Sequence, residues 1–192
     1  MRRSIAMRAR NLVIGCLLVA GPVAAQDIGR VVELPAHRSF MAVRGEAVLA
    51  PFTTDGCSGG LSAGWTLVAE TFPDFAAAQG DVPPWEACCI IHDRAYHDGG
   101  GAEDAEASYD ARVQADEELR SCVRETGESH LEALAIRYDT TPETVRRAYG
   151  TIADAMYMAV RFGGGPCSGL PWRWGYGYPQ CTPFDLALPA RE

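Results

Sequence analysis

Apolar residues recur at intervals of three and four positions in the second half of the chain, which is the spacing that places them on one face of an α-helix. One such segment runs from about 103 to 125 and stops near Gly127. Its apolar and small residues at helical spacing are Ala105, Tyr109, Val113, Ala115, Leu119 and Val123. A second segment runs from about 140 to the glycines at 163–165. The apolar residues along one of its faces are Val145, Ala148, Ile152, Ala155, Met156, Ala159 and Phe162. The pattern predicts two long helices that each bury one face.

Residues that cap or break helices mark the ends of these segments. Residues 140–143 combine a threonine cap, a proline in the first turn and an early glutamate, which is typical of a helix start. The glycine run 163–165 ends the same helix. Residues 85–97 contain no helix breaker and are followed by the turn sequence 98–101, so they are predicted to be helical as well. Two shorter helices are expected at 65–72 and at about 129–138.

The remaining segments lack helical periodicity. Residues 26–50 are mixed in character and are expected to form an extended or irregular lead-in. Residues 53–64 contain four glycines in twelve positions and are expected to form a loop, because glycine at this density serves unusual backbone angles. Residues 73–84 contain three prolines and a glycine, which indicates a connection, and the tail from Pro166 is expected to be a loop. The sequence contains no repeat and no sign of a second domain, so we predict a single, mainly α domain over residues 26–192.

The N-terminus has the parts of a secretory signal peptide. Four arginines without any acidic residue accompany an apolar run at 12–20, which a helix break follows. Small residues at 23–25 then predict cleavage before Gln26 and removal of residues 1–25. The apolar run is too short to cross a bilayer core of roughly 30 Å, and no later segment resembles a transmembrane helix. We therefore expect an exported protein, secreted or periplasmic; a lipoprotein cleavage box at 13–16 is disfavoured because it lies inside the apolar run.

The charge of the chain excludes one class of partner. The formal net charge is −8, and all 17 basic residues are arginines. Without residues 1–25 the chain keeps 13 arginines against 25 acidic residues, a charge of −12. A nucleic-acid-binding protein needs a basic surface, so nucleic acid is not an expected partner. The same balance disfavours a function that depends on attraction to anionic membranes.

The cysteines become informative once export is expected. Setting Cys16 aside leaves six: Cys57, Cys88, Cys89, Cys122, Cys167 and Cys181. In an oxidising compartment six cysteines form up to three disulfides, and about fifteen pairings are possible on sequence alone.

The motif CCIIHD within the helix predicted at 85–97 holds the densest set of reactive side chains. On a helix Cys88, His92 and Tyr96 lie on one face, at intervals of four residues. Cys89 and Asp93 share the neighbouring face. Two adjacent cysteines that point in different directions would join this helix to two different partners. A histidine and an acid would then be held on a rigid element, as a catalytic site requires.

This pattern resembles the secreted phospholipase A2 family. A CCxxHD motif on a helix, preceded by a glycine-rich loop with a cysteine, is the signature of that family, and the resemblance covers about Gly56 to Cys122. In the family a second, antiparallel helix has an aspartate six residues before a cysteine, as Asp116 stands before Cys122 here. Two further family cysteines that pair with each other correspond to Ala95 and Ala115, so both halves of that pair are absent together.

The resemblance implies a fold and a pairing of the cysteines. The expected fold has a core of two disulfide-linked antiparallel helices with a glycine-rich loop at about 53–125, and an extension of helices and a disulfide loop at 128–192. The implied disulfides are Cys57–Cys89 and Cys88–Cys122, which leaves Cys167–Cys181 in the tail. Helix geometry supports this fold. His92 lies about 6 Å along its helix from Cys88, and Asp116 lies about 9 Å along its helix from Cys122. If the two helices run antiparallel and the disulfide joins them, His92 and Asp116 lie at a similar height.

The resemblance also implies a calcium site. The implied ligands are the carboxylate of Asp93 and the backbone carbonyls of Gly56, Ser58 and Gly60. Ca²⁺ is a hard cation that prefers oxygen ligands, and a glycine-rich loop lets carbonyls turn inward. Ser58 stands where many family members have glycine, which leaves its carbonyl available.

The catalytic roles implied by the resemblance belong to three side chains. His92 would act as general base on a water, and Asp116 would fix its tautomer and stabilise the imidazolium. Tyr96 matches a family tyrosine that donates a hydrogen bond to this aspartate, while no second such tyrosine can be placed. Calcium and a backbone N–H near Ser58 would stabilise the oxyanion. The implied substrate is the sn-2 ester of glycerophospholipids, presented as a lipid aggregate or a membrane surface.

Other interpretations of these residues stay open. Asp93 could form a salt bridge with Arg94 or Arg112 instead of binding a metal. A zinc site could be formed by Cys88, Cys89, His92 and His97. The spacing of the two adjacent cysteines disfavours tetrahedral zinc coordination. The aromatic residues of 172–178 could lie at a lipid interface or pack onto the helices, and the C-terminal helices could shield the site. The chain could also be a non-catalytic lipid- or protein-binding module, or a hydrolase of another ester. A binding module, however, has no need of His92, Asp93 and Asp116 together.

Overall fold

The computed structural model describes residues 23–57 and 61–182. Over these two ranges the chain forms seven α-helices and no strand, which confirms the mainly α fold. In chain order they are α1 (Val23–Glu46), α2 (Leu61–Thr71), α3 (Pro73–Gln79), α4 (Glu86–Asp98), α5 (Ala105–Ser129), α6 (Leu131–Arg137) and α7 (Pro142–Gly163). The tail after α7 is irregular, as predicted.

The structure covers only the end of the predicted signal peptide. Residues 1–22, and with them Cys16 and the lipoprotein box, lie outside the described residues. Cleavage before Gln26 stays a prediction. Among the helices that are described, none is long and apolar enough to cross a membrane.

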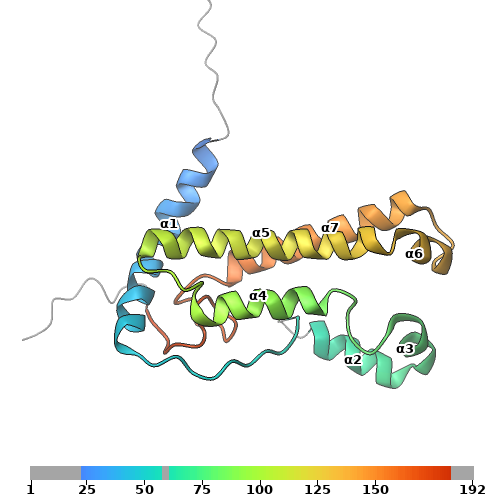
Figure 1. The fold of residues 1–192 in the computed structure, drawn as a ribbon, viewed down its shortest axis with the longest axis horizontal. Helices are drawn as coiled ribbons and strands as arrows, with labels where there is room; N and C mark the ends of the chain where they lie inside the picture. Colours follow the sequence, from blue (N-terminus) through green and yellow to red (C-terminus); the bar gives the residue numbers. More distant parts are fainter. Residues whose placement is uncertain (1–22, 58–60, 183–192) are drawn as a thin grey trace, which may run out of the picture.

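Helix α5 lies at the centre of the arrangement, packed against α7, α4 and α1 (Figure 1). Helices α4 and α5 run antiparallel. Cys88, near the start of α4, is bonded to Cys122 in the second half of α5, whereas Tyr96, near the end of α4, contacts Arg112 in the first half of α5. Helices α2 and α3 lie at the end of the molecule where α4 begins, and α1 and the tail lie at the opposite end (Figure 1).

Two clusters of buried side chains hold the helices together. One cluster joins α4, α5 and α7 and includes Trp85, Leu119, Val123, Tyr149 and Ala153. The other joins α1, α4, α5 and the tail and includes Phe40, Tyr96, Ala115 and Trp174. Phe40 belongs to α1 and Trp174 to the tail, so both segments are part of the folded core. Burial of a large apolar side chain of this kind contributes about 1.5–3 kcal/mol to stability.

The ends of the long helices agree with the capping pattern of the sequence. The Thr141 hydroxyl accepts a hydrogen bond from the N–H of Thr144 at 3.2 Å, and Pro142 occupies the first turn of α7. Helix α4 ends at Asp98, and the following residue, Gly99, has a φ of 71°, in the left-handed region that favours glycine. These local signals explain why the three long predicted segments are helical in the structure.

The prediction of an irregular lead-in over residues 26–50 is wrong, because α1 occupies most of that range. Two features concealed this helix. Pro35 lies inside it, and an interior proline normally breaks a helix because it has no N–H to donate. The buried face of α1 is also partly polar, with His37 and Ser39 almost fully buried, so it shows no apolar periodicity. Only contacts with distant parts of the chain stabilise such a helix.

Two further boundaries differ from the prediction. The predicted connection 73–84 contains α3, which begins at Pro73. Proline is favourable at this first position, because the N–H that it lacks would have no partner inside the helix. Helix α2 begins at Leu61, so it includes the last four residues of the predicted loop 53–64.

Candidate active site

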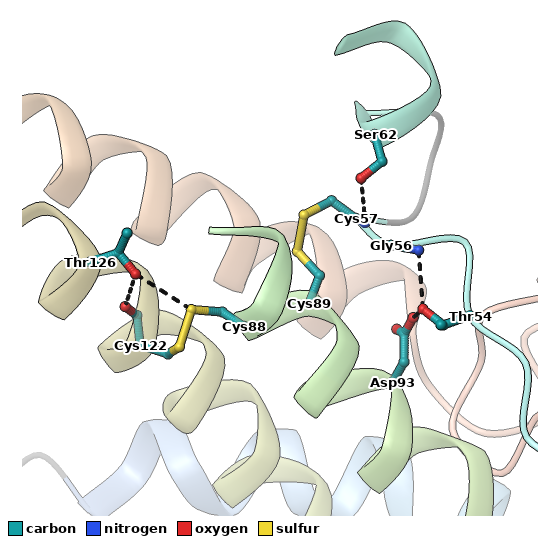
Figure 2. The surroundings of a disulfide bond; sticks show 9 residues. All are labelled: Thr54, Gly56, Cys57, Ser62, Cys88, Cys89, Asp93, Cys122 and Thr126. Atoms are coloured by element: carbon teal, nitrogen blue, oxygen red, sulfur yellow. Dashed lines mark hydrogen bonds between the residues drawn. A yellow bond between two sulfur atoms is a disulfide. The ribbon is translucent and has the colours of Figure 1, made fainter. Parts of the chain in front are cut away.

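Two disulfides hold α4 in place. Cys89 is bonded to Cys57 of the glycine-rich loop, and Cys88 is bonded to Cys122 of α5, with Cα–Cα distances of 5.0 and 5.7 Å. Figure 2 shows the two bonds leaving adjacent positions of α4 toward different elements. Cross-links of this kind typically stabilise a fold by about 2–4 kcal/mol each. The side chains on the following turn of α4 therefore have a fixed position relative to the loop and to α5.

The third disulfide joins Cys167 to Cys181 and closes the tail into a ring. All three bonds are the expected pairings. The zinc interpretation is wrong, because Cys88 and Cys89 are both bonded and have no thiolate to offer. The disulfides are compatible with an oxidising compartment.

His92 and Asp116 meet at the interface of α4 and α5. The Nε2 atom of His92 lies 2.9 Å from Oδ1 of Asp116, and the two residues are 7% and 0% exposed. The Tyr96 hydroxyl donates to the same carboxylate oxygen at 2.7 Å. The rings of His92 and Tyr96 also lie against each other, with centroids 4.1 Å apart. A carboxylate at one ring nitrogen sets the tautomer and the orientation of the imidazole.

The second oxygen of Asp116 binds an arginine that the sequence analysis missed. Arg161 of α7 donates from Nη1 to Oδ2 of Asp116 at 3.0 Å and from Nη2 to Oε1 of Glu33 at 2.6 Å. Arg112 of α5 donates to the other oxygen of Glu33, and its Nε donates to the Tyr96 hydroxyl at 3.2 Å. Side chains from α4 and α7 thus bind one buried carboxylate directly, and Arg112 of α5 and Glu33 of α1 contact those side chains in turn.

Only one of these additional residues left a signal in the sequence. Arg112 precedes Asp116 by four residues and therefore lies on the same face of α5. Arg161 is 45 residues away from Asp116 on another helix, and Glu33 lies on a helix that the sequence pattern did not reveal. Nothing in the local sequence links these two residues to the site.

The surroundings of Asp116 determine its ionisation. Burial by itself would raise the pKa of this carboxyl group, but the hydrogen bond with His92 and the positive charge of Arg112 together hold the pKa below its usual value. Burial raises the pKa of Tyr96 well above its ordinary value. The site therefore combines an ionised aspartate with a neutral tyrosine hydroxyl that donates to it.

Asp93 faces the glycine-rich loop from the neighbouring face of α4 (Figure 2). The Thr54 hydroxyl donates to Oδ2 of Asp93 at 2.6 Å, and the backbone N–H of Gly56 donates to the Thr54 hydroxyl at 3.0 Å. Gly56 has a φ of 74°, a backbone angle that side chains other than glycine rarely adopt. Ser58 and Gly60, the other expected loop ligands, lie outside the described residues.

The environment of Asp93 suits a hard cation. The residue is 7% exposed, burial raises its pKa, and the negative charge of Asp55 adds to this effect. In the described part of the chain no arginine forms an ion pair with Asp93: Arg94 lies over an aromatic ring, and Arg112 pairs with Glu33. The two salt bridges considered as alternatives are therefore wrong. A cation bound by oxygen ligands would offset the cost of burying this carboxylate.

The described residues include no group of three or more His, Cys, Asp or Glu side chains that could hold a metal ion. A site of the kind considered for Asp93 would use one carboxylate together with backbone carbonyls. Such a site differs from a cluster of side-chain ligands, and part of its loop is not described.

An apolar pocket of about 160 Å³ opens beside the catalytic candidates. His92 and Asp93 contribute to its wall. The other lining residues are Cys57, Leu61, Cys89, Leu119, Met156, Ala159, Val160 and Trp172. Helix α7 supplies three of these residues, so the C-terminal part of the chain forms one wall of the pocket. Pockets of this composition, apolar with a few polar groups, are typical of sites for apolar ligands.

The aromatic tail packs onto the site. Trp174 is fully buried, and its ring meets the Tyr96 ring edge-on with centroids 5.0 Å apart. Tyr176 donates from its hydroxyl to the carbonyl of Thr53 at 2.6 Å. The packing interpretation therefore applies to Trp174 and Tyr176, while Trp172 lines the apolar pocket and an adjoining one that also contains Asp93.

The structure thus brings together a buried histidine–aspartate pair, a buried carboxylate beside a glycine-rich loop, and an apolar pocket that the histidine lines. Chemically, this arrangement places an oriented base next to a space for an apolar ligand. No family model, curated protein or solved structure matches the chain.

Proposed function

We propose that the chain hydrolyses the sn-2 ester of glycerophospholipids with the aid of Ca²⁺, as members of the secreted phospholipase A2 family do. The observation that supports this most directly is the position of His92, which is held by Asp116 and lines an apolar pocket together with Asp93. A binding module would need the pocket, but it would have no need of a buried and oriented imidazole–carboxylate pair.

In the proposed reaction His92 acts as the base. Its Nε2 is engaged by Asp116, and no described residue forms a hydrogen bond with its Nδ1, so Nδ1 accepts the proton of a water that attacks the ester carbonyl. Asp116 stabilises the imidazolium that forms, and the proton then passes to the oxygen of the leaving alcohol. Base catalysis of this kind typically contributes about 10²–10⁴-fold to a rate.

The residues that would hold calcium are Asp93 and the loop carbonyls of Gly56, Ser58 and Gly60. Support comes from the buried Asp93 carboxylate, which among the described residues accepts a hydrogen bond from the Thr54 hydroxyl and forms no ion pair with a positive side chain. When bound, the ion would supply Lewis-acid polarisation of the ester carbonyl.

The character of the pocket and the charge of the chain support a lipid substrate. The lining apart from His92 and Asp93 is apolar, and each CH₂ of an acyl chain that leaves water contributes about 0.8 kcal/mol. The formal net charge of −8 provides no general attraction for anionic head groups. We therefore infer that apolar contacts with a phospholipid aggregate or membrane dominate substrate binding.

The test is fatty-acid release from mixed micelles of phospholipid and detergent, with Ca²⁺ and with EDTA. The variants to compare are wild type, His92→Gln and the matched control His130→Gln, which changes an exposed histidine at the end of α5. We expect release that requires Ca²⁺, is lost in His92→Gln and is unchanged in His130→Gln. Tight micelle binding without release would instead establish a non-catalytic module, and cleavage of other esters only would establish a different hydrolase.

A further inference from the structure

The geometry around Asp116 points to a residue outside the CCxxHD motif and its partner helix. We propose that Arg161 is a positioning residue that fixes the carboxylate of Asp116 for its hydrogen bond to His92, and that Glu33 holds Arg161 in place. The catalytic consequence rests on the proposed function. The structural consequence, the orientation of the His92 imidazole, can be measured without any activity.

The two oxygens of Asp116 have different partners. Oδ1 already accepts from Tyr96 at 2.7 Å and lies 2.9 Å from Nε2 of His92. Oδ2 accepts from Nη1 of Arg161 at 3.0 Å, and the aspartate is fully buried. The terminal torsion of an aspartate is soft, so donors on both oxygens are needed to define the plane of the carboxylate. Without Arg161 the buried Oδ2 would lose this charge-assisted donor, and rotation toward Tyr96 or His92 would disturb the bond to the imidazole.

Arg161 is itself held by contacts with α1 and α5. Its Nη2 donates to Oε1 of Glu33 at 2.6 Å, and its guanidinium lies 5.8 Å from the ring centroid of Tyr109. Glu33 also accepts from Arg112, which donates from Nη2 to the backbone carbonyls of Val160 and Arg161 at 2.8 and 3.0 Å. Both the side chain and the backbone of Arg161 are therefore held, so its position relative to Asp116 is well defined.

The charges around Asp116 are balanced. Two arginines and two carboxylates alternate across α5, α1 and α7, in the order Arg112, Glu33, Arg161 and Asp116. The side chains of Asp116 and Arg112 are fully buried, and that of Arg161 is 15% exposed. Buried charges are tolerated only when they are paired, so the removal of Arg161 affects the aspartate more than the loss of a surface arginine would.

The experiment compares Arg161→Met, Arg161→Lys and a matched control on the same helix. The control is Arg146→Met, because Arg146 is exposed and its ion pairs with described residues are those with the surface residues Glu128 and Glu143. Two quantities are measured at one pH: the proton chemical shift of the His92 Nε2–H by NMR, and kcat and KM for phospholipid in micelles. Thermal unfolding of each variant reports on folding.

We expect Arg161→Met to lower kcat about 10- to 100-fold with little change in KM, since a misplaced catalytic group costs rate and not substrate affinity. The His92 Nε2–H resonance is expected to shift or to disappear by exchange. Arg161→Lys is expected to restore part of both signals, because an ammonium can reach Oδ2 but cannot bridge to Glu33 at the same time. Arg146→Met is expected to leave the resonance, kcat and KM unchanged.

A folded Arg161→Met variant with the wild-type His92 resonance would overturn the proposal, whatever its activity. A loss of kcat that Arg161→Lys does not restore, with an unshifted resonance, would also overturn it, since Arg161 would then have only a structural role. If Arg161→Met does not fold, Glu33→Gln replaces it and is expected to shift the resonance in the same direction by a smaller amount; no shift would overturn the proposal. If wild type releases no fatty acid, the proposed function fails, and the resonance alone decides the role of Arg161.

Discussion

His92 and Asp116 are 24 residues apart in the chain, yet Nε2 of the histidine lies 2.9 Å from Oδ1 of the aspartate. The antiparallel arrangement of α4 and α5 accounts for this contact. The Cys88–Cys122 disulfide joins the same two helices one turn of α4 earlier, and it sets the height at which they face each other. The pair is therefore as rigid as the cross-linked interface that contains it.

The first prediction concerns Asp116→Asn. An amide cannot stabilise the imidazolium and allows the wrong tautomer of His92, so kcat is expected to fall by up to about 10⁴-fold. The variant also leaves Arg161 without its buried partner, and the free energy of unfolding is expected to fall by about 3–5 kcal/mol. Urea unfolding and micelle kinetics measure the two effects. Asp154→Asn, which changes an exposed carboxylate on α7, is the control and should leave kcat unchanged; wild-type kcat in Asp116→Asn would contradict the assigned role.

The second prediction concerns the apolar pocket. Met156 lines it, and Met156→Trp is expected to fill it. If the larger side chain keeps two methylene groups of the acyl chain out of the pocket, binding loses about 0.8 kcal/mol for each of them. This loss corresponds to a rise in KM of at least about tenfold. Met158→Trp on the same helix changes a residue that is 48% exposed and does not line this pocket, so its KM should stay at the wild-type value. Equal KM values for both variants would show that the acyl chain binds elsewhere.

The third prediction concerns calcium and Asp93. If the ion binds only the folded chain, Ca²⁺ at 100 times its Kd raises the free energy of unfolding by about 2.7 kcal/mol. Asp93→Asn is expected to abolish this gain. Without calcium the variant is expected to be more stable than wild type, because burial raises the pKa of Asp93 and so penalises its ionised form at neutral pH.

Thermal unfolding with Ca²⁺ and with EDTA measures both effects of Asp93→Asn. Asp98→Asn on the same helix is the control, since Asp98 caps the end of α4 by accepting from the N–H of Gly100. The control should lose a little stability and keep the full calcium effect. A calcium-dependent gain that persists in Asp93→Asn would place the ion at another site.

The fourth prediction concerns pH and His37. Burial lowers the pKa of this histidine, the carboxylate of Glu33, 3.9 Å from its Nε2, opposes the shift, and the positive charge of Arg112 adds to it. The folded chain therefore takes up this proton at a lower pH than the unfolded chain, in which the pKa is near 6.5. As the pH falls below that value the unfolded state binds more protons, so the free energy of unfolding falls, by at most about 1.4 kcal/mol per pH unit for one group.

Urea unfolding at several pH values between 7.5 and 5 measures this slope; such a series spans about one unit on either side of an ordinary histidine pKa. His37→Asn keeps a polar group near the Ser108 hydroxyl, which lies 2.9 Å from Nδ1 of His37, and is expected to flatten the slope. His130→Gln removes an exposed histidine and is expected to retain it. A steep slope in His37→Asn would assign the pH dependence to other groups.

Several features of the fold could be predicted from local sequence alone. The helices now seen as α4, α5 and α7 follow from caps, glycine stops and apolar spacing, for example the Thr141 cap that precedes Pro142. The spacing of Cys88 and His92 placed both on one helix face. These features are encoded within a few turns of chain, so no distant partner is needed to recognise them.

The tertiary structure alone decided the rest of the site. Helix α1 contains Pro35 and buries polar residues, so its stability depends on partners from α5 and α7. Arg161 reaches Asp116, and Glu33 reaches Arg161, only because α1 and α7 pack against α5. An apolar face leaves a periodic trace in the sequence, whereas a buried ion pair requires only one residue on each of two distant elements. That pairing has no local pattern, and it exists only once the helices have packed.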